Sequence, residues 1–176
     1  YLTWAEAGSG DTRGAALGKA RLVIGDAPRL EGLEVIWRQS PKVTGRGHYS
    51  HRIVFSPDGK WLYLVSGERQ KMQPAQNPSS DLGKIFRLPA DSSGKPERVS
   101  MGHRNILGLA FDDQGRLWDL EHGPQGGDEL NLVRPGANYG WPLETYGTTY
   151  ERLRVPSAVS FGRHDTYEAP IYSWVP

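Results

Sequence analysis

Two segments of this chain share one pattern, and that repeat constrains the fold more than any other feature. In residues 53–63 and again in residues 109–118, an apolar run leads through a polar turn into a second apolar run. The turns carry Gly59 and Gly115, and glycine supplies the positive φ that a tight hairpin requires. The two segments begin about 56 residues apart, a period typical of propeller blades with long loops. The repeat predicts an all-β fold.

The rest of the chain fits further strands of the same kind. The expected elements are strands within residues 1–24, 33–38 and 84–88, and long polar surface loops at residues 68–81 and 89–97. These elements amount to roughly three blades, whereas a propeller closes with about four to eight. Residues 1–176 are therefore expected to form part of a single β-propeller domain.

The composition agrees with short strands and argues against several classes of function. The 22 Gly, 13 Pro, 6 Trp and 8 Tyr residues favour turns and aromatic packing over helices. A formal net charge of +1 gives no electrostatic case for nucleic acid and weakens the idea of a strongly charged substrate. No apolar run approaches the roughly 20 residues of a membrane helix, so no membrane insertion is expected. The chain has no cysteine, which rules out disulfides and thiolate metal sites. It begins at Tyr1 without an initiator Met, so its true N-terminus is expected to lie upstream.

A polar run follows the second hairpin. Residues 121–131, which read EHGPQGGDELN, combine glycines, a proline and acidic side chains. Such residues do not favour a continuing strand, so this run is expected to be a loop with exposed carbonyl groups and a local negative charge. Loops of this kind can hold hard cations.

Together with Gly102-His103-Arg104-Asn105 and residues 138–142 (NYGWP), this run closely resembles the soluble quinoprotein aldose sugar dehydrogenases. That family also contains soluble glucose dehydrogenase and the sorbosone dehydrogenase-like proteins. The resemblance implies a six-bladed β-propeller that oxidises aldoses at C1 to lactones. Pyrroloquinoline quinone (PQQ) would accept the hydride and Ca²⁺ would act as Lewis acid. It also implies an exported protein, periplasmic or secreted.

His48 is the candidate general base. It lies in a glycine-containing segment directly before the first hairpin, and an imidazole titrates near neutral pH, so it can accept a hydroxyl proton. A surface or packed histidine is the ordinary alternative. By resemblance, a His followed closely by an Arg at this place removes the proton from the anomeric hydroxyl, and His48 with Arg52 matches that pattern. The family usually has small residues where His51 stands, which makes His51 a rival for the role.

Arg104, Asn105 and Tyr150 are the candidate cofactor ligands. Arg104 and Asn105 directly precede a predicted strand, where a guanidinium could bind a carboxylate or stabilise charge on a reduced quinone, although a surface salt bridge is the simpler alternative. The resemblance implies that both contact PQQ, with Arg104 near the quinone carbonyls and in a catalytic role. Tyr150 matches a PQQ-contacting aromatic residue of the family, and otherwise would serve packing.

The candidate metal ligands follow from the same resemblance. Gly123 and Pro124 would offer backbone carbonyls to a calcium ion that touches PQQ, and Ca²⁺ prefers oxygen ligands of this kind. Glu129, through its carboxylate, and Tyr139, through its carbonyl, would hold a second, structural calcium. The alternative is an ordinary loop with solvated acids. Gly67-Glu68 matches a Gly-acid pair of the family, and no catalytic role is predicted for it.

Other functions remain open on the sequence. One fold hosts many functions, so the chain could form a non-catalytic calcium-binding interaction module. A calcium-dependent lactonase on a similar propeller is the third hypothesis, and the Gly-Pro carbonyl motif fits it poorly. The expected partners are an aldose substrate and an electron acceptor that the sequence does not specify, with a homodimer as an open possibility.

Overall fold

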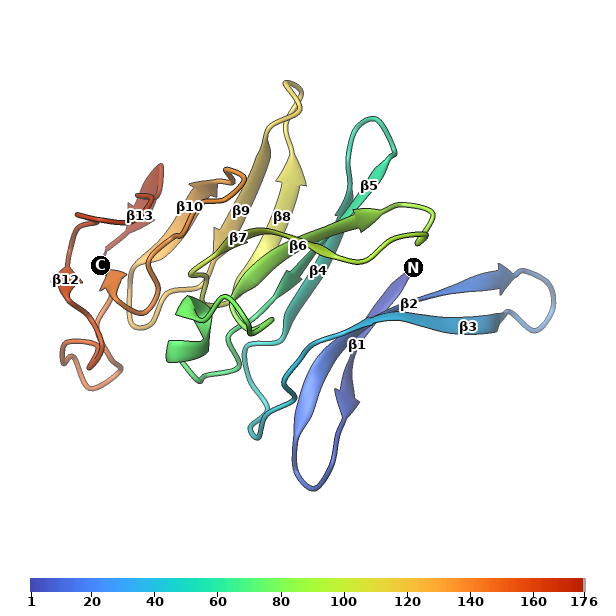
Figure 1. Cartoon of the computed structure of the whole chain (residues 1–176), viewed down its shortest axis with the longest axis horizontal. Helices are drawn as coiled ribbons and strands as arrows, with labels where there is room; N and C mark the ends of the chain where they lie inside the picture. Colours follow the sequence, from blue (N-terminus) through green and yellow to red (C-terminus); the bar gives the residue numbers. More distant parts are fainter. Residues whose placement is uncertain (176) are drawn as a thin grey trace.

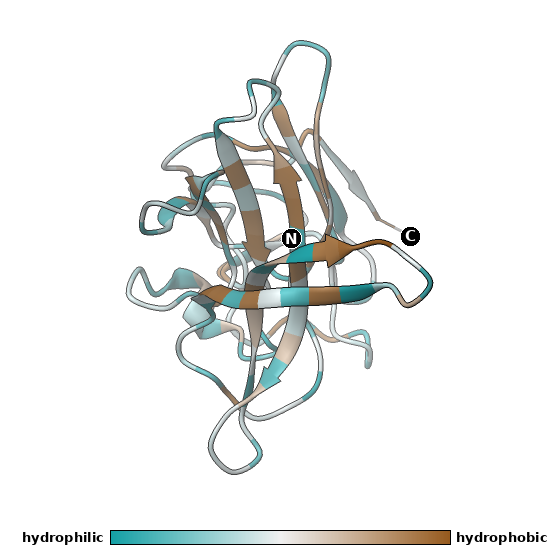
Figure 2. Cartoon of the chain, turned by 90° about the vertical axis from the view of Figure 1, so that its right-hand side faces the viewer, coloured by the Kyte–Doolittle hydropathy of each residue, from teal (hydrophilic) through white to brown (hydrophobic). Residues whose placement is uncertain are grey.

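The computed structural model describes residues 1–175, and its regular secondary structure is β-strand apart from one short 3-10 helix. Three main sheets lie side by side in chain order, as the successive blades of a propeller do (Figure 1). Hydrophobic residues are concentrated on the strands and hydrophilic residues on the turns at the periphery (Figure 2). Within residues 1–175, no helix is long and apolar enough to cross a membrane.

The first sheet has the order β1-β2-β3 and is antiparallel throughout. Its strands are β1 (Leu2–Ala7), β2 (Arg13–Val23) and β3 (Arg29–Arg38). The strand expected at 33–38 is therefore longer than predicted. The ends of β2 and β3 extend beyond the body of the molecule as an arm (Figure 1).

The second sheet contains the first predicted hairpin. Its strands, in spatial order, are β4 (Ser50–Phe55), β5 (Trp61–Ser66), β6 (Lys84–Pro89) and β7 (Glu97–Met101). Gly59 has φ of 69° in the β4–β5 turn, as the sequence pattern required. The strand predicted at 84–88 is confirmed as β6.

The third sheet contains the second predicted hairpin. Its order is β13-β10-β9-β8, with β8 (Ile106–Phe111), β9 (Leu117–Glu121), β10 (Asp128–Leu132) and β13 (Tyr172–Trp174). A short parallel pair, β11 (Glu144–Thr145) and β12 (Ser160–Phe161), lies between β10 and β13 in the chain. The expectation that 121–131 forms one loop was wrong, because Glu121 ends β9 and residues 128–131 belong to β10.

Two apolar clusters lie between neighbouring sheets and hold them together. The cluster between the first and second sheets consists of Ala15, Leu17, Trp37, Leu62, Leu64, Phe86 and Leu88. The cluster between the second and third sheets consists of Val65, Ile85, Val99, Ile106, Leu109, Leu117 and Val133. This packing places β4 beside β8, so the loops that enter these two strands lie next to each other.

The loop from residue 67 to residue 83 is less exposed than its composition predicts. It contains a 3-10 helix, η1 (Gln73–Gln76), and Glu68 and Arg69 within it are buried. Lys84 is also buried, and its Nζ donates to the carbonyls of Pro74, Ala75 and Leu82. These three bonds anchor the loop to β6. Burial lowers the pKa of Lys84 to about 7.

Candidate functional site

One pocket gathers candidate residues from separate parts of the chain. It has a volume of about 320 Å³, and its walls include four residues predicted from the sequence: His48, Arg104, Pro124 and Tyr150. They come from the loops that enter β4 and β8, from the β9–β10 loop and from the segment after β11. The other lining residues are Glu68, Gln70, Met72, Trp141, Thr149, Glu151, Val155 and Pro156.

His48 is held by a carboxylate. Its Nδ1 lies 2.5 Å from Oε1 of Glu68, and the side chains of His48 and Glu68 are 15% and 1% exposed. The same carboxylate accepts the backbone N–H groups of Gln70 and Met72 at 2.9 and 2.5 Å. With Glu68 ionised, Nδ1 of His48 donates to it, which leaves Nε2 free to accept a proton. This is the arrangement of a base with its orienting carboxylate.

The backbone around His48 adopts an uncommon conformation. His48, Ser50 and His51 have φ values of 51°, 57° and 50°, in the left-handed region that residues other than glycine rarely occupy. Gly67 lies directly opposite, and a Cβ added there would collide with the carbonyl oxygen of His48. A glycine at position 67 therefore permits the close approach that brings Glu68 to the imidazole.

Arg104 is buried, at 6% exposure, although it ends a loop. Its Nη1 donates to the carbonyl of His122 at 2.7 Å, and its Cζ lies 5.3 Å from the centroid of the Trp141 ring. The backbone of Arg104 is fixed on both sides, because its N–H donates to Glu121 and its carbonyl accepts the N–H of Glu68. His48 and Arg104 are thus linked through Glu68, whose carboxylate contacts His48 and whose backbone N–H donates to Arg104.

Two aromatic residues complete the pocket. Trp141 is buried, and its Nε1–H has no acceptor among residues 1–175. Tyr150 is 67% exposed, so it offers a free ring at the rim. The pocket therefore combines a cation with flat apolar surfaces.

Three other candidates lie outside this lining. Asn105 accepts a hydrogen bond from Ser50 Oγ at 3.1 Å through its Oδ1. His51, the rival base, contacts Thr3 Oγ1 at 3.1 Å, and burial lowers its pKa. Arg52 is exposed. A cofactor contact by Asn105 stays a prediction.

The four predicted calcium ligands line one small cavity of about 10 Å³. Gly123, Pro124, Glu129 and Tyr139 all contribute to it, and Glu144 adds a further carboxylate residue. This volume is about that needed for a single water molecule or ion. Arg104, Pro124 and Trp141 line both this cavity and the larger pocket, which makes the two cavities neighbours.

The β9–β10 loop is shaped by glycine and by its own polar contacts. A Cβ at Gly123 would collide with the carbonyl oxygens of Gly126 and Gly127. The N–H of Gly123 donates to Asp128 at 2.8 Å, and its carbonyl lies 2.5 Å from Nδ1 of His122. Glu129 is buried rather than solvated, and burial first, then the charge of Glu121, raises its pKa.

A buried polar network lies beneath Arg104. Glu121 accepts from the Arg104 N–H at 2.6 Å, and its other oxygen lies 3.1 Å from His103 Nδ1. Ligand atoms of His103, Asp119 and Glu121 lie within 4.8 Å of one another, but the amide of Asn131 already donates to both carboxylates. Burial raises the pKa of Asp119, whose Oδ2 has no hydrogen-bond partner among the described residues and lies 3.8 Å from His103 Nδ1. The network therefore fixes the backbone of Arg104 through the Glu121 carboxylate.

Glu68 is the functional candidate that sequence reasoning missed. It had been given no role, yet it contacts His48. The signal was present in the hairpin, because the residue that precedes one antiparallel strand lies next to the residue that follows its partner. His48 precedes β4 and Glu68 follows β5, so pairing alone brings them together.

Known proteins resemble this chain over most of its length. The family model described as Glucose / Sorbosone dehydrogenase matches residues 1–176. The chain belongs to this family. Aldose sugar dehydrogenase YliI of Escherichia coli K12 is 35% identical over 188 residues, covering 99% of this chain and 50% of the relative. Quinoprotein glucose dehydrogenase B of Acinetobacter calcoaceticus is 32% identical over 127 residues, covering 56% of this chain and 27% of the relative.

Solved structures of the family share the fold. A glucose dehydrogenase crystal structure superposes with a TM-score of 0.91 at 39% identity, over 99% of this chain and 53% of that one. The PQQ-bound form of aldose sugar dehydrogenase from Streptomyces coelicolor gives a TM-score of 0.66 at 29% identity, over 98% of this chain and 48% of that one. The all-β propeller fold is confirmed. The chain spans about half the length of the first two curated relatives, 50% and 43%.

Proposed function

We propose that this chain supplies the base and part of the cofactor pocket of a PQQ-dependent aldose dehydrogenase. The observation that carries the proposal is the shared pocket, where His48, Arg104, Pro124 and Tyr150 meet although they are far apart in the sequence. The names of the relatives, which include a quinoprotein and a PQQ-bound enzyme, support the same activity.

The larger pocket fits PQQ in its chemistry. The cofactor is flat and anionic, and the pocket offers the Arg104 guanidinium and the rings of Tyr150 and Trp141. A flat ring system stacks on aromatic side chains, and carboxylate or quinone oxygens accept from buried donors. Arg104, Trp141 and Tyr150 would therefore hold the cofactor.

The small cavity fits a calcium ion in its donor set. The resemblance implied two calcium ions, one at Gly123 and Pro124 and one at Glu129 and Tyr139, but all four residues line one cavity of single-ion size, so we propose a single ion. Carbonyl and carboxylate oxygens of these residues are hard ligands of the kind that Ca²⁺ prefers. A buried carboxylate also favours a counter-cation, because ionising it without one is costly. The contact between Gly123 O and His122 would have to open for that carbonyl to bind metal.

Different residues would accept the proton and stabilise the negative charge. Nε2 of His48 accepts the proton of the sugar's C1 hydroxyl, and the buried Glu68 carboxylate stabilises the imidazolium that forms. Arg104 places a positive charge beside the site where negative charge develops. When bound, PQQ supplies the acceptor for the hydride from C1 and calcium supplies a Lewis acid, so the product would be a lactone.

The test is a PQQ titration with and without Ca²⁺, followed by aldose-driven dye reduction. The protein would be compared with its His48→Ala, Arg104→Ala and His51→Ala variants. Sugar oxidation should need both PQQ and Ca²⁺, collapse in His48→Ala with PQQ still bound, and survive in His51→Ala. Arg104→Ala should weaken PQQ binding.

Two outcomes would reject this function. Calcium binding without PQQ affinity or sugar oxidation would point to the interaction module, and lactone hydrolysis without PQQ would point to the lactonase. The family resemblance is the basis for proposing export to the periplasm or medium. It is likewise the basis for proposing an electron acceptor and a homodimer.

A further inference from the structure

Arg69 has an unusual environment for a charged residue. Its side chain is fully buried and its φ is 60°. The guanidinium donates to three backbone carbonyls, those of Gly47, Arg13 and Gly45, at 2.8, 2.6 and 2.5 Å. Among residues 1–175, the hydrogen-bond partners of this guanidinium are thus all carbonyl oxygens, and none is a carboxylate.

The contacts of Arg69 surround the loop that carries His48. Two of the three carbonyls belong to residues 45–47, directly before the base, and the backbone N–H of Arg69 donates to the carbonyl of His48 at 3.3 Å. On the other side, the guanidinium carbon lies 3.7 Å from the centre of the Tyr49 ring. Arg69 therefore contacts His48 and both of its neighbours.

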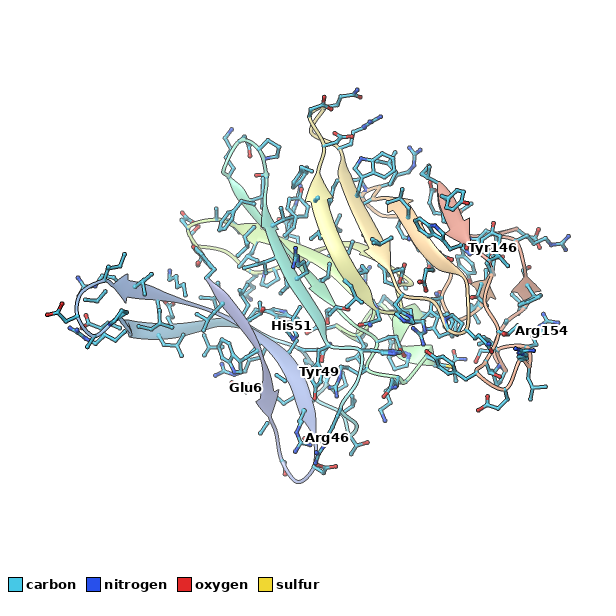
Figure 3. The ribbon with its side chains drawn as sticks, turned by 180° about the vertical axis from the view of Figure 1, so that it is seen from behind. Glu6, Arg46, Tyr49, His51, Tyr146 and Arg154 are labelled. Carbon is cyan, nitrogen blue, oxygen red and sulfur yellow. The ribbon has the colours of Figure 1, made fainter. Side chains whose placement is uncertain are left out.

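Figure 3 shows Tyr49 and His51 near the start of β4, beside β1 and β2, with Arg46 further out on the same loop. The third carbonyl, from Arg13, belongs to the first residue of β2. Arg69 thus ties the loop before β4 to the neighbouring sheet as well as to its own sheet.

The loop before β4 requires stabilising contacts of this kind. His48, Ser50 and His51 all have positive φ, and on the facing loop so do Arg69, Gln70 and Met72. Each such residue costs on the order of 1 kcal/mol, and the conformation persists only when surrounding contacts over-determine it. Burying a guanidinium without a carboxylate is itself unfavourable, and burial lowers the pKa of Arg69. Several well-made bonds from one rigid, planar group offset both costs.

We propose that Arg69 is a positioning residue, which locks the loop of residues 45–49 so that the His48 imidazole meets Glu68 and faces the pocket. The inference rests on the proposed function for its effect on catalysis. Its structural part stands independently, because the orientation of His48 can be measured without substrate.

The test uses Arg69→Met, which removes the donors but keeps much of the apolar bulk, and Arg69→Lys, which keeps the charge but loses the planar fork. Tyr49→Leu is a milder third variant, since it removes the stacked ring and leaves the carbonyl bonds of Arg69 intact. Arg46→Met is the matched control, because Arg46 is an exposed arginine of the same loop. Two readouts are made on each folded variant: steady-state kinetics, and the ¹⁵N resonances of the His48 ring, assigned with His48→Ala.

In Arg69→Met we expect kcat to fall by about 10- to 100-fold with KM little changed, because a small displacement of a catalytic group costs on the order of 100-fold. The His48 resonances should lose the Nδ1-protonated pattern or broaden. Arg69→Lys should recover only part of the loss, Tyr49→Leu should be intermediate, and Arg46→Met should match the wild type.

The proposal is overturned if Arg69→Lys and Tyr49→Leu are folded and show wild-type kcat and unchanged His48 resonances. Should Arg69→Met not fold, these two variants decide the matter. If the wild type oxidises no aldose, the proposed function fails, and the His48 resonances alone still test whether Arg69 positions the base.

Discussion

Glu68→Gln is the sharpest test of the base. In the structure one carboxylate oxygen serves both His48 Nδ1 and the N–H of Gln70, while the other accepts the N–H of Met72. The glutamine oxygen can keep the first two bonds, so the tautomer of His48 is retained. The amide NH₂ then faces the N–H of Met72, and two buried donors meet.

The magnitudes follow from these contacts. Replacing a hydrogen bond to a charged group by a neutral one removes at most the 1.5 to 3 kcal/mol that such bonds contribute, so kcat should fall by about 10- to 150-fold. The unsatisfied N–H of Met72 should separately lower the free energy of unfolding by about 1 to 3 kcal/mol.

The assay is aldose-driven dye reduction at saturating PQQ and Ca²⁺, together with urea unfolding of the same samples. Glu97→Gln is the control, because Glu97 is an exposed carboxylate on β7 that pairs with Arg87. A folded Glu68→Gln enzyme with kcat within twofold of the wild type would refute the assignment of Glu68 as the stabiliser of the imidazolium.

Three further predictions concern packing, pH and metal. Gly67→Ala should lower the melting temperature and kcat together, because the new methyl group would collide with the His48 carbonyl; calorimetry and kinetics on one preparation test this. The pKa of Lys84 is about 7 in the native protein and that of an ordinary lysine in the unfolded chain, so between pH 7 and pH 10 the unfolded chain holds a proton that the native protein has released. The free energy of unfolding should therefore rise with pH in this range, by up to about 1.4 kcal/mol per pH unit. Urea titrations should show this slope in the wild type but not in Lys84→Met. Chelation with EGTA should lower the melting temperature of the wild type by several degrees but hardly that of Glu129→Gln, since the carboxylate would be a ligand.

The fold was predictable where it depends on local chemistry. The turns at Gly59 and Gly115 specify hairpins by the φ they allow, and both hairpins formed as expected. Strand β10 was missed because its buried positions are polar: Glu129 and Asn131 are buried, whereas Leu130 and Leu132, which alternate with them, are less buried. Hydrophobic periodicity cannot reveal a strand whose buried face is made of polar residues.

The site was predictable only in part, for a similar reason. His48 and Arg104 could be found because each lies two residues before a strand, β4 and β8 respectively. Arg69 could not be found, because arginine is rarely buried and its partners are carbonyl groups that carry no sequence signature. Glu68 could have been found from strand pairing alone.

The relative placement of base and cation follows from these contacts. The carboxylate of Glu68 contacts His48, and the backbone N–H of Glu68 donates to the carbonyl of Arg104 at 3.0 Å. One residue that follows β5 therefore connects the loop that enters β4 with the loop that enters β8. Because this connection is a backbone bond, substitution of Glu68 should alter the charge next to His48 but leave Arg104 in place. A Glu68→Gln protein that keeps wild-type PQQ affinity while losing kcat would show that separation, whereas loss of both would mean that the carboxylate itself holds the two loops together.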